Sequence, residues 1–218
     1  MILTNRLFER QSPSREAKSL YIFCEGAKRE FQYFEYFREI DSRIKVEVNK
    51  LSPNDDNSPN GLYNLAESSF CGTKPKFTLQ ENDEVWIVLD TDPDKSNSRE
   101  EQINQIKEKC NQKVNWFIVE SSPCFEVWLF FHKNEKVIEF ESDTICKSGK
   151  QKVNESYEGR FDSRRHPIFI EEAILNSEKN FQRNENGRPT KGSSEVHLLA
   201  KSMFSVIKNK IRAIKNKL

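Results

Sequence analysis

A short apolar run that ends in closely spaced aspartates constrains the fold of this chain more than any other feature. Residues Val85–Leu89 form the run, and Asp90, Asp92 and Asp94 follow it at alternating positions. A run this short, rich in β-branched and aromatic residues, predicts a strand buried on both faces, as in a parallel sheet covered by helices. Ligands of such sheets bind outside the carboxyl ends of the strands, which is where the aspartates fall. Because carboxylates this close repel one another, a cation or protons must offset their charge.

Apolar runs and helical periodicities alternate along the chain as far as His132. Strands are expected at Ser19–Cys24, Ile44–Val48, Val85–Leu89 and Val114–Val119, and helices at Ala27–Ile40, Leu62–Phe70, Ser98–Cys110 and Cys124–Phe131. Pro123 is expected in the first turn of the last helix, where proline is well tolerated. Four alternations of strand and helix predict an α/β, Rossmann-like fold with a parallel four-stranded sheet flanked by helices.

The chain is expected to consist of a core with additions at both ends. Residues 1–17 are polar and predict a weakly ordered lead-in, and residues 18–135 hold the α/β core. Residues 136–218 are expected to form a charged, mostly helical region that packs on the core, although residues 133–165 show little periodicity. Its helices are expected at Pro167–Leu175 and, after a cap at Ser193 or Ser194, as far as Ile207.

The composition argues against several classes of protein. The formal net charge is +1, so there is no global basic field, and nucleic acid would have to contact local patches. Five cysteines and three histidines lie far apart without a CxxC pair, which disfavours a zinc site or a disulfide framework and favours free thiols in a reducing cytosol. We see no signal peptide and no apolar run of ~18 residues, so we expect a soluble, cytoplasmic protein without membrane contact. A P-loop phosphotransferase is disfavoured because the GxxxxGK(S/T) motif does not occur.

Acids lie at the ends of two of the expected strands. Glu25 and Gly26 follow the first strand, and Asp90, Asp92 and Asp94 follow the third. Since the carboxyl ends of parallel strands meet at one edge of a sheet, these acids can converge on Mg²⁺ or Mn²⁺, hard cations that prefer carboxylate oxygens. Gly26 would let the backbone turn towards a phosphate at the amino end of the next helix. The alternative is that the acids only cap loops and helices at the surface.

Four segments of the chain resemble a known family. They are CEGAKREFQYFEYF (Cys24–Phe37), VLDTDPD (Val88–Asp94), SSPCFEVWLFFH (Ser121–His132) and PTKGSSEVHLLAKSM (Pro189–Met203). Glu-Gly after one strand and Asp-x-Asp after a later strand resemble the Toprim domain of topoisomerases, primases and OLD-type nucleases. The four segments in this order resemble the RloB-like family, also called AbiLii-like, from about residue 18 to about residue 207. The resemblance implies a Toprim-like core and an association with restriction loci and anti-phage defence.

The resemblance also implies roles for individual acids. Glu25 matches the Toprim glutamate, a metal ligand or general acid/base, while Asp90 and Asp92 match the Asp-x-Asp metal ligands. These three are therefore the expected catalytic residues, and Asp94 and Glu126 are further candidate ligands for Mg²⁺ or Mn²⁺. Glu126 lies in an otherwise apolar segment, where a carboxylate needs a partner. A buried ion pair between Glu126 and an arginine is an equal alternative.

Basic residues near the expected site are candidates for binding nucleic acid. The residues assigned to this role are Lys28, Arg29, Lys95, Arg99 and Lys191, and the same groove could include Arg164, Arg165, His166 and Arg188. For each of them, a solvated surface charge is the more common explanation. His132 is a candidate proton shuttle, with a hydrogen-bonded structural role as the alternative, and His197 is expected to be packed on the last helix.

Two functions of different classes are compatible with the sequence. The first is a Toprim-type, Mg²⁺-dependent nuclease that cleaves phosphodiester bonds of RNA or DNA in anti-phage defence. The second is a non-catalytic subunit of a defence complex that binds nucleic acid or a protein partner. The resemblance also implies an ATPase encoded nearby as a partner. Formation of a homo-oligomer is a further possibility that the sequence leaves open.

Overall fold

Four parallel strands form one sheet in the computed structural model of the chain, which describes residues 17–26, 28–52, 54–91, 98–140 and 145–217. The strands are β1 (Lys18–Cys24), β2 (Ile44–Lys50), β3 (Glu84–Asp90) and β4 (Trp116–Ser121). Their order in the sheet is β2-β1-β3-β4, and each neighbouring pair is parallel. The α/β class and the four-stranded parallel sheet that the sequence predicts are therefore confirmed.

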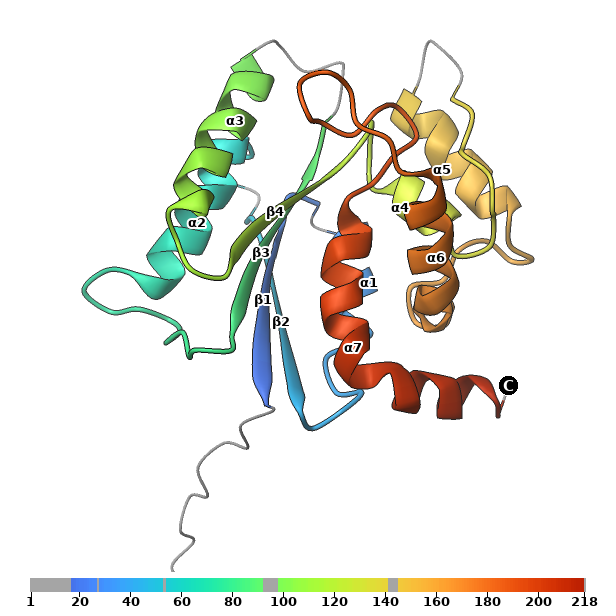
Figure 1. Ribbon diagram of the computed structural model, residues 1–218, viewed down its shortest axis with the longest axis horizontal. Coiled ribbons are helices and arrows are strands. Elements are labelled where there is room, and N and C mark those ends of the chain that lie inside the picture. Colours follow the sequence, from blue (N-terminus) through green and yellow to red (C-terminus); the bar gives the residue numbers. More distant parts are fainter. Residues whose placement is uncertain (1–16, 27, 53, 92–97, 141–144, 218) are drawn as a thin grey trace, which may run out of the picture.

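Helices cover both faces of the sheet (Figure 1). One face packs against α2 (Pro59–Phe70) and α3 (Ser98–Asn111). The other face packs against α1 (Arg29–Glu35), α4 (Glu126–Phe130) and α7 (Val196–Lys215). Behind these, α5 (Ile145–Glu155) packs on α4 and α6 (Ile170–Asn180) packs on α4 and α7, and a 3-10 helix, η1 (His166–Phe169), precedes α6. The predicted helical C-terminal region is thus confirmed.

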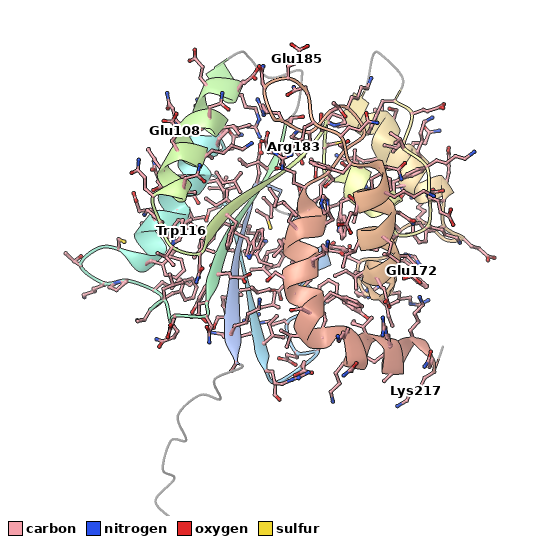
Figure 2. All side chains as sticks on the ribbon, in the orientation of Figure 1. Glu108, Trp116, Glu172, Arg183, Glu185 and Lys217 are labelled. Carbon is pink, nitrogen blue, oxygen red and sulfur yellow. The ribbon has the colours of Figure 1, made fainter. Side chains whose placement is uncertain are left out.

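The central strand β3 is buried on both faces, as its apolar run predicts. The side chains of Val85–Leu89 are between 0 and 5% exposed, with Trp86 and Val88 on one face and the other three on the opposite face. Burial of each such side chain contributes about 1.5–3 kcal/mol relative to exposure. On the edge strand β4, Trp116, which is labelled in Figure 2, has its ring in contact with that of Tyr63 of α2. This layering fixes the direction of β3 and therefore the position of Asp90 at its carboxyl end.

The C-terminal helices share a hydrophobic cluster with the sheet. Leu20 of β1 and Trp86 of β3 belong to the same buried cluster as Val196 and Met203 of α7. The sequence-based boundary at residue 135 remains a prediction. Among the described helices, none combines the length and the hydrophobicity that crossing a bilayer requires.

Helix α5 is the element that the sequence patterns did not predict. The side of α5 that meets the core includes Ser148 and Gly149, and Val153 on this helix is fully buried. A Cβ atom at Gly149 would lie 3.0 Å from the ring of Phe140 and 3.4 Å from Cβ of Glu126. The close approach of α5 thus uses small residues, which give the helix an amphipathic pattern with few large apolar side chains.

Several predicted boundaries differ from the structure. Helix α1 is shorter than Ala27–Ile40, because the regular helix ends at Glu35, and α7 continues beyond Ile207 to Lys215. The prediction that Pro123 lies in the first turn of a helix is wrong, because α4 begins three residues later at Glu126. The Ser122–Pro123 peptide bond is cis.

Candidate functional site

The carboxyl ends of β1 and β3 bring Glu25 and Asp90 to the same edge of the sheet. Cys24 is paired with Val88, and the amide of Glu25 donates to the carbonyl of Val88 at 3.4 Å. Asp90 ends β3 opposite Ser121 of β4. The structure therefore brings these two predicted acids to one edge, whereas Asp92, Asp94 and Lys95 lie outside the described residues.

Two further acids reach this edge from the first turns of helices. Glu30 in α1 is 9% exposed, and Glu126 in α4 is 4% exposed. The carboxylate of Glu30 lies over Gly26, where an added Cβ atom would be 1.8 Å from Oε2 of Glu30. A side chain at position 26 would displace this carboxylate, so glycine leaves the space that the carboxylate occupies.

Glu25, Glu30, Asp90 and Glu126 form one electrostatic unit, which we call the acid cluster. Burial raises the pKa of Asp90 well above its usual range, and the charges of Glu30, Glu126 and Glu25 raise it further. Burial likewise raises the pKa of Glu30 to about 7, and the neighbouring Glu126 and Glu25 add to the effect. Such shifts arise because like charges in a poorly solvated site disfavour ionisation.

Two arginines bind members of the acid cluster. Arg29 donates from Nη1 to Oε1 of Glu126 at 3.1 Å. Arg99, at the start of α3, donates to the carboxylate of Glu25 and also to the backbone carbonyl of Asp90. The alternative explanation for Glu126, a buried ion pair with an arginine, is therefore what the structure shows. Its role as a metal ligand stays a prediction.

The chemistry of the acid cluster fits a hard divalent cation. Buried carboxylates with raised pKa values lose part of their mutual repulsion when a cation binds them. Cys24 and Cys124 lie beside the cluster, and burial raises the pKa of Cys24, which keeps its thiol neutral and leaves oxygen atoms as the charged donors. Within the described ranges, however, no three acidic, cysteine or histidine side chains are already arranged to hold a metal ion. The donors suit Mg²⁺ or Mn²⁺, but Glu25 and Glu126 are engaged by arginines.

We expect Mn²⁺ to raise the melting temperature more at about pH 8 than at about pH 5. In the folded protein the pKa of Glu30 is about 7, whereas its ordinary value is 4.5. Protonated Glu30 therefore contributes its full share of the folding free energy below pH 4.5, and this contribution is lost as the pH rises through 7. A cation bound to the ionised cluster offsets this loss, and a hundredfold excess over Kd stabilises the fold by about 2.7 kcal/mol. Thermal unfolding in Mn²⁺ and in EDTA at both pH values tests this. A pH-independent shift, or one that survives unchanged in Glu30→Gln, contradicts binding at the acid cluster.

The predicted nucleic-acid-binding residues do not form one group. Lys28 and Lys191 are exposed, and Arg29 is 30% exposed beside the acid cluster. Arg99 is only 5% exposed, and its described contacts are with Glu25 and Asp90. The assignment of these four residues to nucleic acid remains a prediction.

The other basic residues that were candidates for a nucleic-acid groove differ from one another in exposure and in their contacts. Arg164 and Arg165 are exposed and lie beside Asp162, and the ring of His166 stacks on Tyr157. Arg188 is not a solvated surface charge, since it is 8% exposed and bonded to the fully buried carboxylate of Glu120, and its place in a nucleic-acid groove remains a prediction. Its partner is distant in the sequence, so no local pattern indicates the pairing.

Two histidines have structural roles. His132 is buried, with Nδ1 3.1 Å from the carbonyl of Trp128 and Nε2 3.0 Å from the hydroxyl of Tyr33. We assign the proton to Nδ1, which donates to the carbonyl, while Nε2 accepts from the hydroxyl. Burial lowers the pKa of His132 to about 3, so the ring stays neutral and the structural alternative holds. His197 is also buried, as expected, and its Nδ1 lies 2.7 Å from the carbonyl of Ser194.

Sequence reasoning missed Glu30, although a signal for it exists. Tyr33, Phe34 and Phe37 are fully buried, and Glu30 precedes them by three, four and seven positions. These spacings place Glu30 on the same face of α1 as the aromatic residues, not on an outer face. An acid in line with a buried helical stripe indicates a carboxylate that has a role in the interior.

The fold and the site together define a class of protein: an open, parallel α/β protein that gathers carboxylates at the carboxyl end of its sheet. The model of the RloB-like protein family matches residues 20–203, and the chain belongs to that family. Neither curated proteins nor solved structures gave a match.

Proposed function

We propose that this RloB-like protein is a divalent-cation-dependent nuclease that hydrolyses phosphodiester bonds. The observation behind the proposal is the acid cluster, in which Asp90 and Glu25 at two strand ends share an electrostatic site with Glu30 and Glu126. Buried acids that repel one another destabilise a fold, so their presence at the ligand-binding edge of the sheet argues for a role beyond structure. The resemblance to Toprim nucleases points to the same chemistry.

The residues of the chain would divide the work as follows. Asp90 and Glu25, together with Asp92, would hold Mg²⁺ or Mn²⁺, with Asp94 and Glu126 as further candidate ligands. When bound, the cation would supply positive charge to the scissile phosphate and the leaving oxygen.

Glu30 and the exposed basic residues would complete the reaction site. The pKa of Glu30, raised to about 7, suits proton transfer from an attacking water at neutral pH. Lys28, Arg29 and Lys191 would contact the nucleic-acid backbone. The family's association with restriction loci supports a role of this activity in anti-phage defence, and an ATPase encoded nearby would be its partner.

A cleavage assay tests the proposal. The protein is incubated with RNA, including tRNA, and with single- and double-stranded DNA, in Mg²⁺, in Mn²⁺ or in EDTA. We expect cation-dependent cleavage of at least one substrate and none in EDTA. Cleavage that persists in EDTA, or that does not copurify with the protein across two chromatographic steps, contradicts the proposal.

A second function has one observation in its favour. The ion pairs Arg99–Glu25 and Arg29–Glu126 balance two of the four acids without any cation. This arrangement suits a non-catalytic subunit that binds nucleic acid or a protein partner. Tight nucleic-acid binding in EDTA, unaffected by substitution of Asp90 and without cleavage in either metal, would favour this function.

A further inference from the structure

Arg99 joins the ends of two neighbouring strands at the acid cluster. Its Nε and Nη2 atoms donate to the backbone carbonyl of Asp90 at 3.1 and 2.8 Å, and Nη2 also donates to Oε2 of Glu25. The residue is 5% exposed. One guanidinium group therefore binds the side chain that follows β1 and the backbone that ends β3.

We propose that Arg99 is a positioning residue of the acid cluster rather than a contact for nucleic acid. The proposal rests on the proposed function, because it concerns how the chain presents Glu25 and Asp90 to a cation. A planar guanidinium with fixed donor directions sets the distance and angle between the groups that it binds, which a flexible lysine does not. Arg99 thus holds the Oε2 atom of Glu25 in a fixed place relative to the backbone carbonyl of Asp90. Hydrogen bonds from outer residues commonly orient ligating carboxylates in this way.

The Arg29–Glu126 pair differs from the Arg99–Glu25 pair in the number of hydrogen bonds that the arginine makes and in the exposure of the arginine side chain. Arg29 makes one hydrogen bond to that carboxylate, at 3.1 Å, and its side chain is 30% exposed. Arg99 makes three hydrogen bonds and its side chain is 6% exposed. Because a residue with several buried bonds has little freedom to turn towards a substrate, Arg99 is the one suited to a fixed orienting role.

The opposite end of the sheet supplies a matched control. Lys18 joins the amino ends of the same two strands, since its Nζ atom donates to Glu84 at 3.0 Å and to Ser202 at 2.6 Å. Its side chain is 15% exposed. Replacing Lys18 removes a bridge between β1 and β3 without touching the acid cluster, so a general loss of sheet stability can be separated from a change at the site.

Mn²⁺ binding tests the role of Arg99. Dissociation constants are measured by electron paramagnetic resonance of free Mn²⁺ for the wild type, Arg99→Met, Arg99→Lys and Lys18→Met. We expect Arg99→Met to weaken binding by about 10- to 100-fold. Arg99→Lys keeps the charge but not the fork of donors, so we expect it to stay about tenfold weaker than the wild type. Lys18→Met should bind as the wild type does.

The outcomes separate this proposal from the proposed function. If the wild type binds no Mn²⁺, the cation-dependent function fails and the role of Arg99 fails with it. If the wild type binds Mn²⁺ and Arg99→Met binds equally or more tightly, only the role of Arg99 is overturned. Should Arg99→Met not fold, Arg99→Lys decides, and wild-type affinity in that variant overturns the proposal. An equal loss in Lys18→Met would also overturn it, because the effect would then be general.

Discussion

Replacing Asp90 by asparagine is expected to remove nucleic-acid cleavage and, at the same time, to stabilise the fold above neutral pH. Loss of a carboxylate that holds the cation should lower the cleavage rate by about 10³-fold or more. The opposite effect on stability arises because burial, together with Glu30, Glu126 and Glu25, raises the pKa of Asp90. An asparagine of the same shape has no charge for these neighbours to repel. Activity and stability should therefore change in opposite directions, as at sites that are strained for function.

The sign of the pH dependence follows from the raised pKa. The folded state binds the Asp90 proton more tightly than the unfolded state does, so the associated stability is present below the unfolded pKa and is lost as pH rises through the folded value. The Asp90→Asn variant should lose less of its free energy of unfolding than the wild type between about pH 5 and pH 8. Urea denaturation at the two pH values, without divalent cations, measures this difference.

Asp41 provides a control of opposite sign. It lies before β2, at the other end of the sheet, and hydrogen bonds from Arg43 lower its pKa to about 2. The stability from Asp41 is present above its unfolded pKa and is lost as pH falls through about 2, so Asp41→Asn should destabilise the protein at pH 8 and leave cleavage unchanged. Wild-type cleavage by Asp90→Asn would remove Asp90 from the reaction. Destabilisation by Asp90→Asn at pH 8 would show that its carboxylate is a structural acceptor.

The parts of the fold that could be predicted are those with a local signal. The run Val85–Leu89 is buried on both faces because every residue in it is apolar, and that property can be seen without knowledge of its neighbours. The parallel direction of the strands followed from the alternation of strands and helices, and with it the placement of Glu25 and Asp90 at one edge, whereas the strand order was not predicted. The helix α5 was missed although its sequence is amphipathic, because its contact side includes the small residues Ser148 and Gly149 and few large apolar ones.

The parts of the site that could not be predicted depend on contacts between distant segments. Arg99 meets Glu25 across 74 positions, and Arg29 meets Glu126 across 97 positions. Composition and spacing identify arginines near acids, but they do not indicate which guanidinium is buried by the fold. Sequence reasoning therefore allows an arginine as the partner of Glu126 but does not say which one, and it treats each named arginine as a surface charge or a phosphate ligand, whereas two of them bind the acid cluster.

Arg188→Met is expected to cause the largest loss of stability among the substitutions considered, although Arg188 lies outside the acid cluster. Its guanidinium donates to Oε2 of Glu120, whose side chain is fully buried at the end of β4, and Lys107 forms an ion pair with the other oxygen. Removing one member of a buried ion pair leaves a poorly compensated charge and costs about 3–5 kcal/mol. For a chain of 218 residues this corresponds to a fall in melting temperature of roughly 10 °C.

The position of Glu120 explains why this ion pair matters to the whole fold. The amide of Glu195 donates to the carbonyl of Glu120 at 2.8 Å, and Ser121 forms a β-bridge with Ser194. The loop before α7, which includes the labelled Arg183 (Figure 2), is thereby attached to the edge strand. Loss of Arg188 should loosen this attachment as well as expose the charge of Glu120.

Thermal unfolding of three variants separates the buried charge from a general surface effect. Arg212→Met removes an ion pair with Glu171 in which the arginine is 56% exposed, and it should change the free energy of unfolding by less than about 1 kcal/mol. The double variant Glu120→Gln/Arg188→Met should recover much of the stability lost in Arg188→Met, because the uncompensated carboxylate is gone. If Arg188→Met is no less stable than Arg212→Met, the pair contributes no more than a surface contact. If the double variant is less stable than Arg188→Met alone, the cost comes from lost packing and not from the buried charge.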